Sequence, residues 1–133
     1  MTTELYWLIL TVLMTALFWV PYILNRMAVR GLMGTLSGAI PETGEPQTAW
    51  AQRAIKAHYN AIENLAIFIP AALAAHLLGI STPATRVAVV VYFIARLIHF
   101  IVYTAGLPAL RTLTFAAGWA AQVVLLLSVL KWI

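Results

Sequence analysis

The sequence predicts an all-α integral membrane protein, a bundle of four transmembrane helices in a single domain that fills residues 1–133. Of its residues, 63% are hydrophobic and only 9% are charged, and the mean hydropathy is +0.93. Four apolar runs each have the length of roughly 20 residues that a spanning helix needs. These runs lack the period-two alternation of barrel strands, so helices are the spanning structure that we expect.

The first predicted helix covers residues 5–30 and has no charged residue between Glu4 and Arg26. Pro21 lies in its last third, where we expect a kink. The run does not have the pattern of a cleavable signal peptide, because it starts with Glu4 in place of a basic region and no small-residue cleavage site follows it.

The second predicted helix, residues 50–79, follows the one long loop that we expect, residues 31–49. This loop contains Glu42 and Glu45, half of the acidic residues in the chain. A long loop in a compact domain is often functional or mobile. Pro70 lies deep in the second helix, where we expect it to bend the axis.

The third predicted helix covers residues 84–105 and the fourth covers residues 109–131. A short turn at residues 79–83 precedes the third helix, and Gly106-Leu107-Pro108 forms a tight turn before the fourth. Both helices are apolar apart from a few polar side chains.

The net charge of +4 is explained better by membrane topology than by nucleic acid, which is not an expected partner. Most of the basic residues lie on the side of the first and third loops, and basic residues concentrate on the cytoplasmic side of membrane proteins. We therefore expect both termini outside, the 31–49 loop in the cytoplasm, and, in a prokaryote, a location in the inner membrane. The chain has no cysteine, which excludes a disulfide framework, a thiol nucleophile and a cysteine metal site.

A polar stripe runs along the second predicted helix. Arg53, Lys56, Asn60 and Glu63 are spaced i, i+3, i+7 and i+10, which places them on one helical face. A carboxylate in the hydrocarbon region costs roughly 3 kcal/mol or more, so such groups usually mark a functional site. Two cations, an amide and an acid on one face suit a small zwitterionic ligand.

The third predicted helix carries a similar face, formed by Tyr92, Arg96, His99 and Tyr103. We expect the two polar faces to meet, with Glu63 paired to Arg96 either within one chain or across a subunit boundary. The alternative is a buried ion pair that only fixes helix packing.

The three histidines do not predict a metal site, because no cysteine accompanies them. His58 points away from the polar stripe, which predicts a packing or interfacial role, and the isolated His76 is expected to be structural. The two lie roughly 27 Å apart along one helix, too far for a haem pair. His99 shares the polar face of the third helix, and its role stays open.

Arg111 and Thr112 begin the fourth predicted helix. A cation and a hydroxyl at a helix amino terminus can hold an anion or a thiolate. The alternative is an ordinary interfacial arginine beside a hydroxyl helix cap. Tyr103 is either a hydroxyl donor or a buried tyrosine bonded to a carbonyl group.

Three motifs in order resemble the MAPEG family, the membrane-associated proteins in eicosanoid and glutathione metabolism. They are Arg-x-x-Lys-Ala-His-x-Asn-x-x-Glu-Asn from Arg53, Ala-Arg-x-x-His-x-x-x-Tyr from Ala95, and Leu-Arg-Thr from Leu110. The resemblance covers essentially the whole chain and is greatest to the small bacterial members.

The resemblance implies a homotrimer of four-helix protomers, with glutathione as co-substrate between neighbouring subunits near the cytoplasmic side. By position it implies a set of glutathione-binding residues: Arg53, Lys56, Asn60, Glu63, Arg96, His99 and Arg30 (or Arg26). It implies that Arg111 stabilises the thiolate, and Thr112 stands where a serine occurs in the prostaglandin-synthase branch. Tyr59 and Phe115 depart from that branch, which has an arginine and a tyrosine at these positions.

Three functions compete. The first is a membrane-bound glutathione transferase or peroxidase without a metal, in which Arg111 favours the thiolate and Thr112 or Tyr103 donates a hydrogen bond. A lipophilic electrophile would enter from the membrane lipid. The second is a non-catalytic lipid- or thiol-binding membrane protein, which Tyr59 and Phe115 favour. The third, a small drug–proton antiporter, ranks last because the first helix has no acid beyond Glu4.

Overall fold

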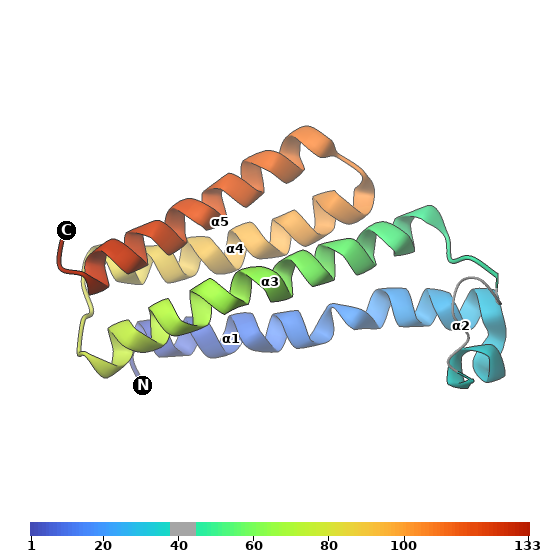
Figure 1. Ribbon diagram of the computed structural model, residues 1–133, viewed down its shortest axis with the longest axis horizontal. Helices are drawn as coiled ribbons and strands as arrows, with labels where there is room; N and C mark the ends of the chain where they lie inside the picture. The colour runs from blue at the N-terminus through green and yellow to red at the C-terminus, as the bar shows by residue number, and fades with distance from the viewer. Residues whose placement is uncertain (38–44) are drawn as a thin grey trace.

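The computed structural model describes residues 1–37 and 45–133, which form an elongated bundle of α-helices (Figure 1). The described helices are α1 (Thr3–Leu17), α2 (Trp19–Leu36), α3 (Ala49–Leu77), α4 (Pro83–Ala105) and α5 (Pro108–Val129). Helices α1 and α2 together make the first span, so the four predicted spans are confirmed. Of the predicted 31–49 loop, residues 38–44 lie outside the described residues.

Both termini and the α3–α4 turn lie at one end of the bundle, here called the terminal end (Figure 1). The end of α2, the start of α3 and the α4–α5 turn lie at the opposite end, here called the loop end. Four stretches are long and apolar enough to cross a membrane: Thr3–Leu36, Ala49–Leu77, Pro83–Ala105 and Pro108–Val129. The protein is therefore an integral, multi-pass membrane protein.

The first span is broken at Phe18, which separates α1 from α2. Pro21 has no N–H group, and its ring clashes with the carbonyl group four residues earlier, that of Leu17. The Phe18 N–H instead bonds the Thr15 carbonyl oxygen at 3.2 Å. The predicted kink is thus confirmed, one turn before the proline. The predicted end of this helix at residue 30 agrees with the backbone, because Gly31 has a non-helical φ angle of +73°, and only a short helical segment, up to Leu36, follows it within α2.

Helix α3 packs against all four other helices and forms the centre of the bundle. Its buried face is rich in alanine, with Ala54, Ala57 and Ala61 towards the loop end and Ala71 and Ala72 towards the terminal end. Small side chains let helix backbones approach closely where no water drives association. Helix α3 continues without a break through Pro70.

Both predicted turns are confirmed, and glycine in the left-handed region makes each possible. Gly106 ends α4 with φ +79°, and Pro108 begins α5 directly after it. At the other turn, Thr82 and Thr85 form a capping box at the start of α4. These local signals fix where α4 and α5 begin.

Glu4, at the start of α1, is fully buried at the terminal end. Its carboxylate accepts hydrogen bonds from the hydroxyl groups of Thr85 (2.6 Å) and Ser81 (3.2 Å). Thr2 lies beside it and hydrogen-bonds the Nδ1 atom of His76 at 2.9 Å. The start of α1 is therefore tied to the α3–α4 turn, and the predicted structural role of His76 is confirmed.

Candidate functional site

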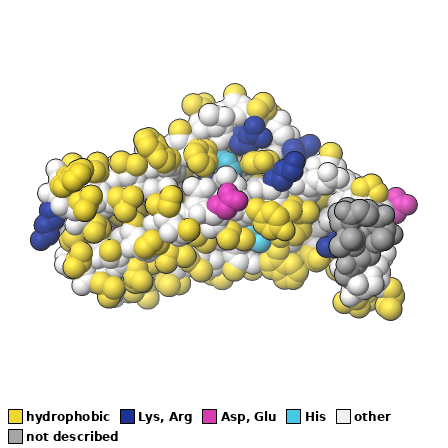
Figure 2. Space-filling model, in the orientation of Figure 1, with side chains coloured by type: hydrophobic (Ala, Val, Ile, Leu, Met, Phe, Trp, Pro, Cys, Tyr) yellow, Lys and Arg dark blue, Asp and Glu magenta, His cyan; other side chains and the backbone are white. Residues whose placement is uncertain are grey.

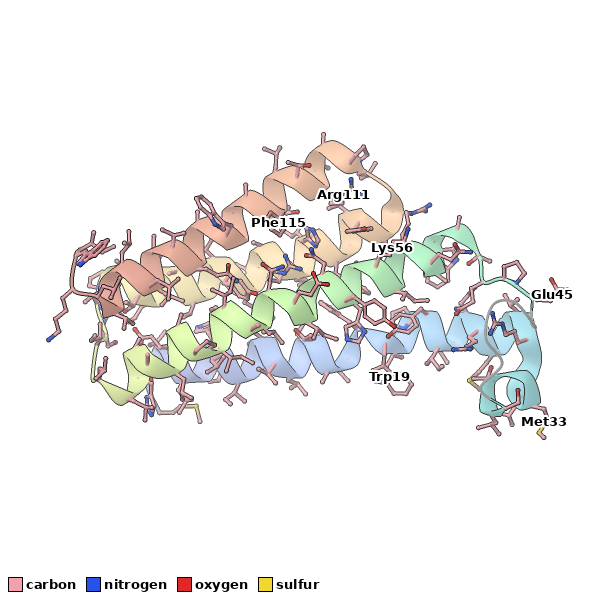
Figure 3. All side chains as sticks on the ribbon, viewed as in Figure 1. Trp19, Met33, Glu45, Lys56, Arg111 and Phe115 are labelled. Atoms are coloured by element: carbon pink, nitrogen blue, oxygen red, sulfur yellow. The ribbon has the colours of Figure 1, made fainter. Side chains whose placement is uncertain are left out.

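A polar cavity of about 280 Å³ lies between α3, α4 and α5 near the loop end. Figure 3 shows Arg111 and Phe115 on the side of α5 that faces α3 and α4. The residues that line the cavity are Asn60, His99, Tyr103, Arg111, Thr112 and Phe115. The structure thus brings together five of the residues predicted for the site, and adds Phe115.

Arg96 joins α4 to α3 beside this cavity. The Nη2 atom of Arg96 donates a hydrogen bond to the Asn60 side-chain oxygen at 2.7 Å, and the arginine is 98% buried. The two polar faces therefore meet, as predicted. The predicted Glu63–Arg96 pair within one chain was wrong, because Glu63 is exposed and forms no ion pair with Arg96. Its pairing across a subunit boundary stays a prediction.

The angular positions on α3 explain this difference. At about 100° per residue, Asn60 lies about 20° from Arg53 around the helix axis, whereas Glu63 lies about 80° away. The packing of α3 against α4 turns the Arg53–Asn60 edge of the stripe inward, and Lys56 and Glu63 face outward. Figure 2 shows acidic, basic and histidine side chains gathered on this face of the bundle.

His99 forms the floor of the cavity and is almost fully buried. Its ring lies edge-on to Tyr103, with centroids 5.6 Å apart, and 6.2 Å from the ring of Phe115. The Nδ1 atom has no hydrogen-bond partner within the described residues. A buried polar atom without a partner is costly, so this nitrogen has an unused capacity for a hydrogen bond beside the cavity.

Arg111 lies on the other wall of the cavity, with its guanidinium carbon 4.8 Å from the centre of the Tyr103 ring. This cation–π contact holds the arginine at the cavity without neutralising its charge. The Thr112 hydroxyl donates to the Pro108 carbonyl oxygen at 3.1 Å, as expected in the first turn of a helix. The Thr112 hydroxyl is therefore already used within its own helix. The Tyr103 hydroxyl has no hydrogen-bond partner among the described residues, so it is the better donor to a ligand.

Arg53 stabilises the turn that carries Arg111. Its Nε atom donates to the Thr104 carbonyl oxygen at 2.9 Å, at the end of α4. A side chain at Gly106 would place its Cβ atom only 3.2 Å from the same Nε atom. Glycine therefore allows Arg53 to lie against the α4–α5 turn, outside the lining of the cavity.

A second cavity, of about 620 Å³, lies between the end of α2, residues 46–47 and the start of α3. It collects two predicted binding residues, Arg30 and Lys56, together with Tyr59. The Nε atom of Arg30 donates to the Glu45 carbonyl oxygen at 2.7 Å. Figure 3 shows Lys56 at the loop end of α3. Within one chain, the predicted site residues do not share one cavity: five line the smaller one, two line the larger one, and Arg53, Glu63 and Arg96 line neither.

Gln122 is a buried polar residue that the sequence analysis missed. Its side-chain nitrogen donates to the Asn64 carbonyl oxygen at 3.0 Å and lies 3.4 Å from the Tyr92 hydroxyl. Tyr92 in turn stacks on Phe68, with ring centroids 3.8 Å apart. The signal in the sequence was a single side-chain amide in the otherwise mostly apolar helix that became α5. These contacts join α3, α4 and α5 below the cavity.

His58 lies on the opposite side of α3 from Arg53. It is buried, and its Nδ1 atom hydrogen-bonds the Tyr22 hydroxyl at 2.7 Å. Its ring also lies edge-on to Phe18, with centroids 6.2 Å apart. The predicted packing role is confirmed. Within residues 1–37 and 45–133, no group of three or more His, Asp or Glu side chains is placed to hold a metal ion.

The cavity thus combines a guanidinium group, a phenol and a histidine near the loop end of three helices. This combination suits an anion that forms by loss of a proton. A model of the MAPEG family matches residues 4–131, which is nearly the whole chain. Comparison with curated proteins and with solved structures gives no significant match.

Proposed function

The chain belongs to the MAPEG family, which includes glutathione-dependent transferases and peroxidases, and from that premise we propose that it is such an enzyme. In this proposal it activates the glutathione thiol and conjugates or reduces lipophilic electrophiles that enter from the bilayer. The observation that carries the proposal is Arg111, a cation held over the Tyr103 ring at the wall of a polar cavity.

The cysteine part of glutathione fits the smaller cavity. Ligand pockets usually measure about 300–1,000 Å³, so a cavity of about 280 Å³ accommodates part of a tripeptide and leaves the remainder outside. The outward-facing Lys56 and Glu63 supply charges for that remainder: the acid for the amino group, and the cation, with Arg30, for the carboxylates. Arg53, Arg96 and Asn60 then position the helices that hold the thiol.

We propose that the remaining wall comes from a neighbouring subunit of a homotrimer. Glu63 is exposed on α3 amid apolar side chains such as Ile62 and Ile67. A charge that faces lipid is costly, and a second copy of the chain would cover it. The second cavity, with Arg30 and Tyr59, lies on the same outward side of α3 as Lys56.

The chemistry needs no nucleophile from the protein. A free thiol has a pKa of about 8.5 and is mostly protonated at neutral pH. A guanidinium group lowers the pKa of a nearby thiol because it favours the anion. The thiol proton leaves to water at the cavity mouth, the sulfur attacks the electrophilic carbon, and the leaving group departs with its electron pair. With a lipid hydroperoxide, two glutathione molecules give the alcohol, water and glutathione disulfide.

Stopped-flow ultraviolet absorbance of the glutathione thiolate tests this proposal directly. We expect the purified wild-type protein to form thiolate at a pH below the pKa of the free thiol, and Arg111→Ala to lose the signal while it retains glutathione binding. Arg86→Ala is the matched control, since Arg86 lies at the terminal end and bonds only the Ser81 carbonyl and hydroxyl groups in the described residues. Full thiolate formation in Arg111→Ala would contradict the assigned role.

A non-catalytic lipid- or thiol-binding protein is the second candidate. Phe115 favours it, because it places a ring without a hydroxyl group in the cavity wall. This candidate predicts saturable binding of glutathione or lipid with neither a thiolate signal nor turnover of any electrophile.

A further inference from the structure

Helix α2 changes direction sharply at Gly31. This residue has φ +73° and ψ +169°, a backbone conformation that is essentially restricted to glycine. The six residues that follow, 32–37, are here called the hook. Figure 1 shows the hook turned away from the axis of α2 at the loop end.

The hook has an exposed apolar surface. Leu32, Met33 and Leu36 are 56%, 76% and 70% exposed. At about 100° per residue these three positions fall within one arc of about 100° on the helical turn. In Figure 3, Met33 lies at the outer edge of the hook and points away from the bundle.

Both hydroxyl groups of the hook have hydrogen-bond partners in the hook or in the adjacent Gly31. The Thr35 hydroxyl donates to the Gly31 carbonyl oxygen at 2.9 Å, and the Ser37 hydroxyl donates to the Gly34 carbonyl oxygen at 3.0 Å. The Ser37 N–H donates to the Met33 carbonyl oxygen at 2.9 Å. Since only unpaired polar groups are costly in an apolar environment, these hydroxyl groups do not require water.

The length of the first span places the hook near the membrane surface. The roughly 28 residues from Thr3 to Arg30, before the Gly31 bend, would measure about 42 Å as a straight helix, against a hydrocarbon thickness of about 30 Å. The end of α2 therefore leaves the hydrocarbon in the region of Arg26 and Arg30. Basic residues at this level favour an anionic headgroup layer.

We propose that the hook is an interfacial anchor that docks on the anionic surface of the protein's own bilayer. Leu32, Met33 and Leu36 insert among the acyl chains, and Arg26 and Arg30 lie at the level of the headgroups. The Gly31 bend returns the chain to the membrane instead of letting α2 project into water. The anchor thereby fixes the level of Arg30, and of the larger cavity that it lines, at the membrane surface.

Site-directed spin labelling tests this inference, and the absence of native cysteine means that each variant carries a single label. Nitroxides are placed at Met33→Cys and Leu36→Cys in proteoliposomes that contain phosphatidylglycerol. Thr35→Cys, on another side of the hook, is the matched control. Ile94→Cys, in the middle of α4, is the reference for lipid, and Glu45→Cys is the reference for water. Power saturation then compares collisions with oxygen and with a water-soluble nickel complex.

We expect the labels at residues 33 and 36 to collide with oxygen nearly as often as the lipid reference and with nickel far less often than Glu45→Cys. The label at residue 35 should show collision rates between those of the lipid reference and the water reference. Nickel collisions at residue 33 equal to those of the water reference would place the hook in water and overturn the proposal. Low collision rates with both reagents would place the hook against protein and would also overturn the proposal.

A second variant tests the role of the bend. Gly31→Ala adds a side chain that meets no neighbour within 4 Å, but it disfavours the observed φ angle. In Met33→Cys protein that also carries Gly31→Ala, we expect the nickel accessibility of the label to rise several-fold. Unchanged accessibility would show that glycine is not needed to return the chain to the bilayer.

Discussion

At the scale of single residues, the candidate site depends on how a few polar groups are satisfied in an apolar bundle. Arg96 is almost completely buried and has one side-chain partner among the described residues, the amide of Asn60. A hydrogen bond to a buried charged group stabilises more than a neutral one does. Asn60 therefore has two roles, since it lines the cavity and also holds Arg96 in position between α3 and α4.

We predict that Asn60→Ala lowers the free energy of unfolding by about 2 kcal/mol, because it leaves the buried Arg96 guanidinium without its hydrogen bond. Denaturant titration in detergent, followed by circular dichroism, measures the change. Lys56→Ala is the control on the exposed side of the same helix, where we expect a change within about 0.5 kcal/mol. Equal unfolding midpoints for wild type and Asn60→Ala would show that Arg96 has another partner.

At the scale of the elements, the turns decide where the ends of the helices place their side chains. Gly106 performs two tasks in the α4–α5 turn, since it adopts a positive φ angle and leaves space for Arg53. Arg53 bonds the Thr104 carbonyl oxygen, so α3 and this turn are joined. Arg111 lies four residues after Leu107, where the turn ends. Its position over Tyr103 therefore depends on this junction.

We predict that Gly106→Ala destabilises the protein by about 2 kcal/mol or more and that Gly79→Ala does so by about 1 kcal/mol. Both place alanine at a left-handed backbone position, which alone costs roughly 1–2 kcal/mol. Only at Gly106 would the new Cβ atom also approach the Arg53 side chain, at 3.2 Å, whereas Gly79 has open space. Thermal unfolding in detergent compares the pair. Equal losses of stability in the two variants would mean that the Arg53 side chain moves away from the new Cβ atom at little cost.

At the scale of the whole molecule, the outward face of α3 is incomplete in a single chain. It presents Glu63 and Lys56 together with large apolar side chains, among them Ile62 and Ile67. Lipid solvates the apolar side chains but not the charges. The larger cavity opens on the same side. These features are the physical basis for the proposed homotrimer.

We predict that native mass spectrometry of the detergent-released protein gives three times the mass of one 14.6 kDa chain. Ile67→Arg should shift the population towards single chains, because it places a cation in the proposed contact between subunits. Ile67→Leu, which preserves apolar volume, should leave the three-chain complex intact. A wild-type spectrum with only single chains would contradict the trimer.

The sequence by itself determined the number and approximate position of the spans, and it indicated the polar residues that are candidates for the site. Apolar runs of spanning length and the glycines at the turns act over a few residues, so they can be read locally. The motifs on three helices were also sufficient to indicate the family, which the match over residues 4–131 confirms. The break near Pro21 followed from the missing N–H group of proline.

Only the tertiary structure decided which polar groups meet. A difference of about 60° around the axis of α3 turns Asn60 towards Arg96 and Glu63 away from it, and spacing along one helix does not set that rotation. The burial of Glu4 against Thr85, and the contacts of Gln122, likewise join residues far apart in the chain. Their partners follow from how the helices pack, because a hydrogen bond requires two atoms within about 3 Å, a condition that no single segment can impose.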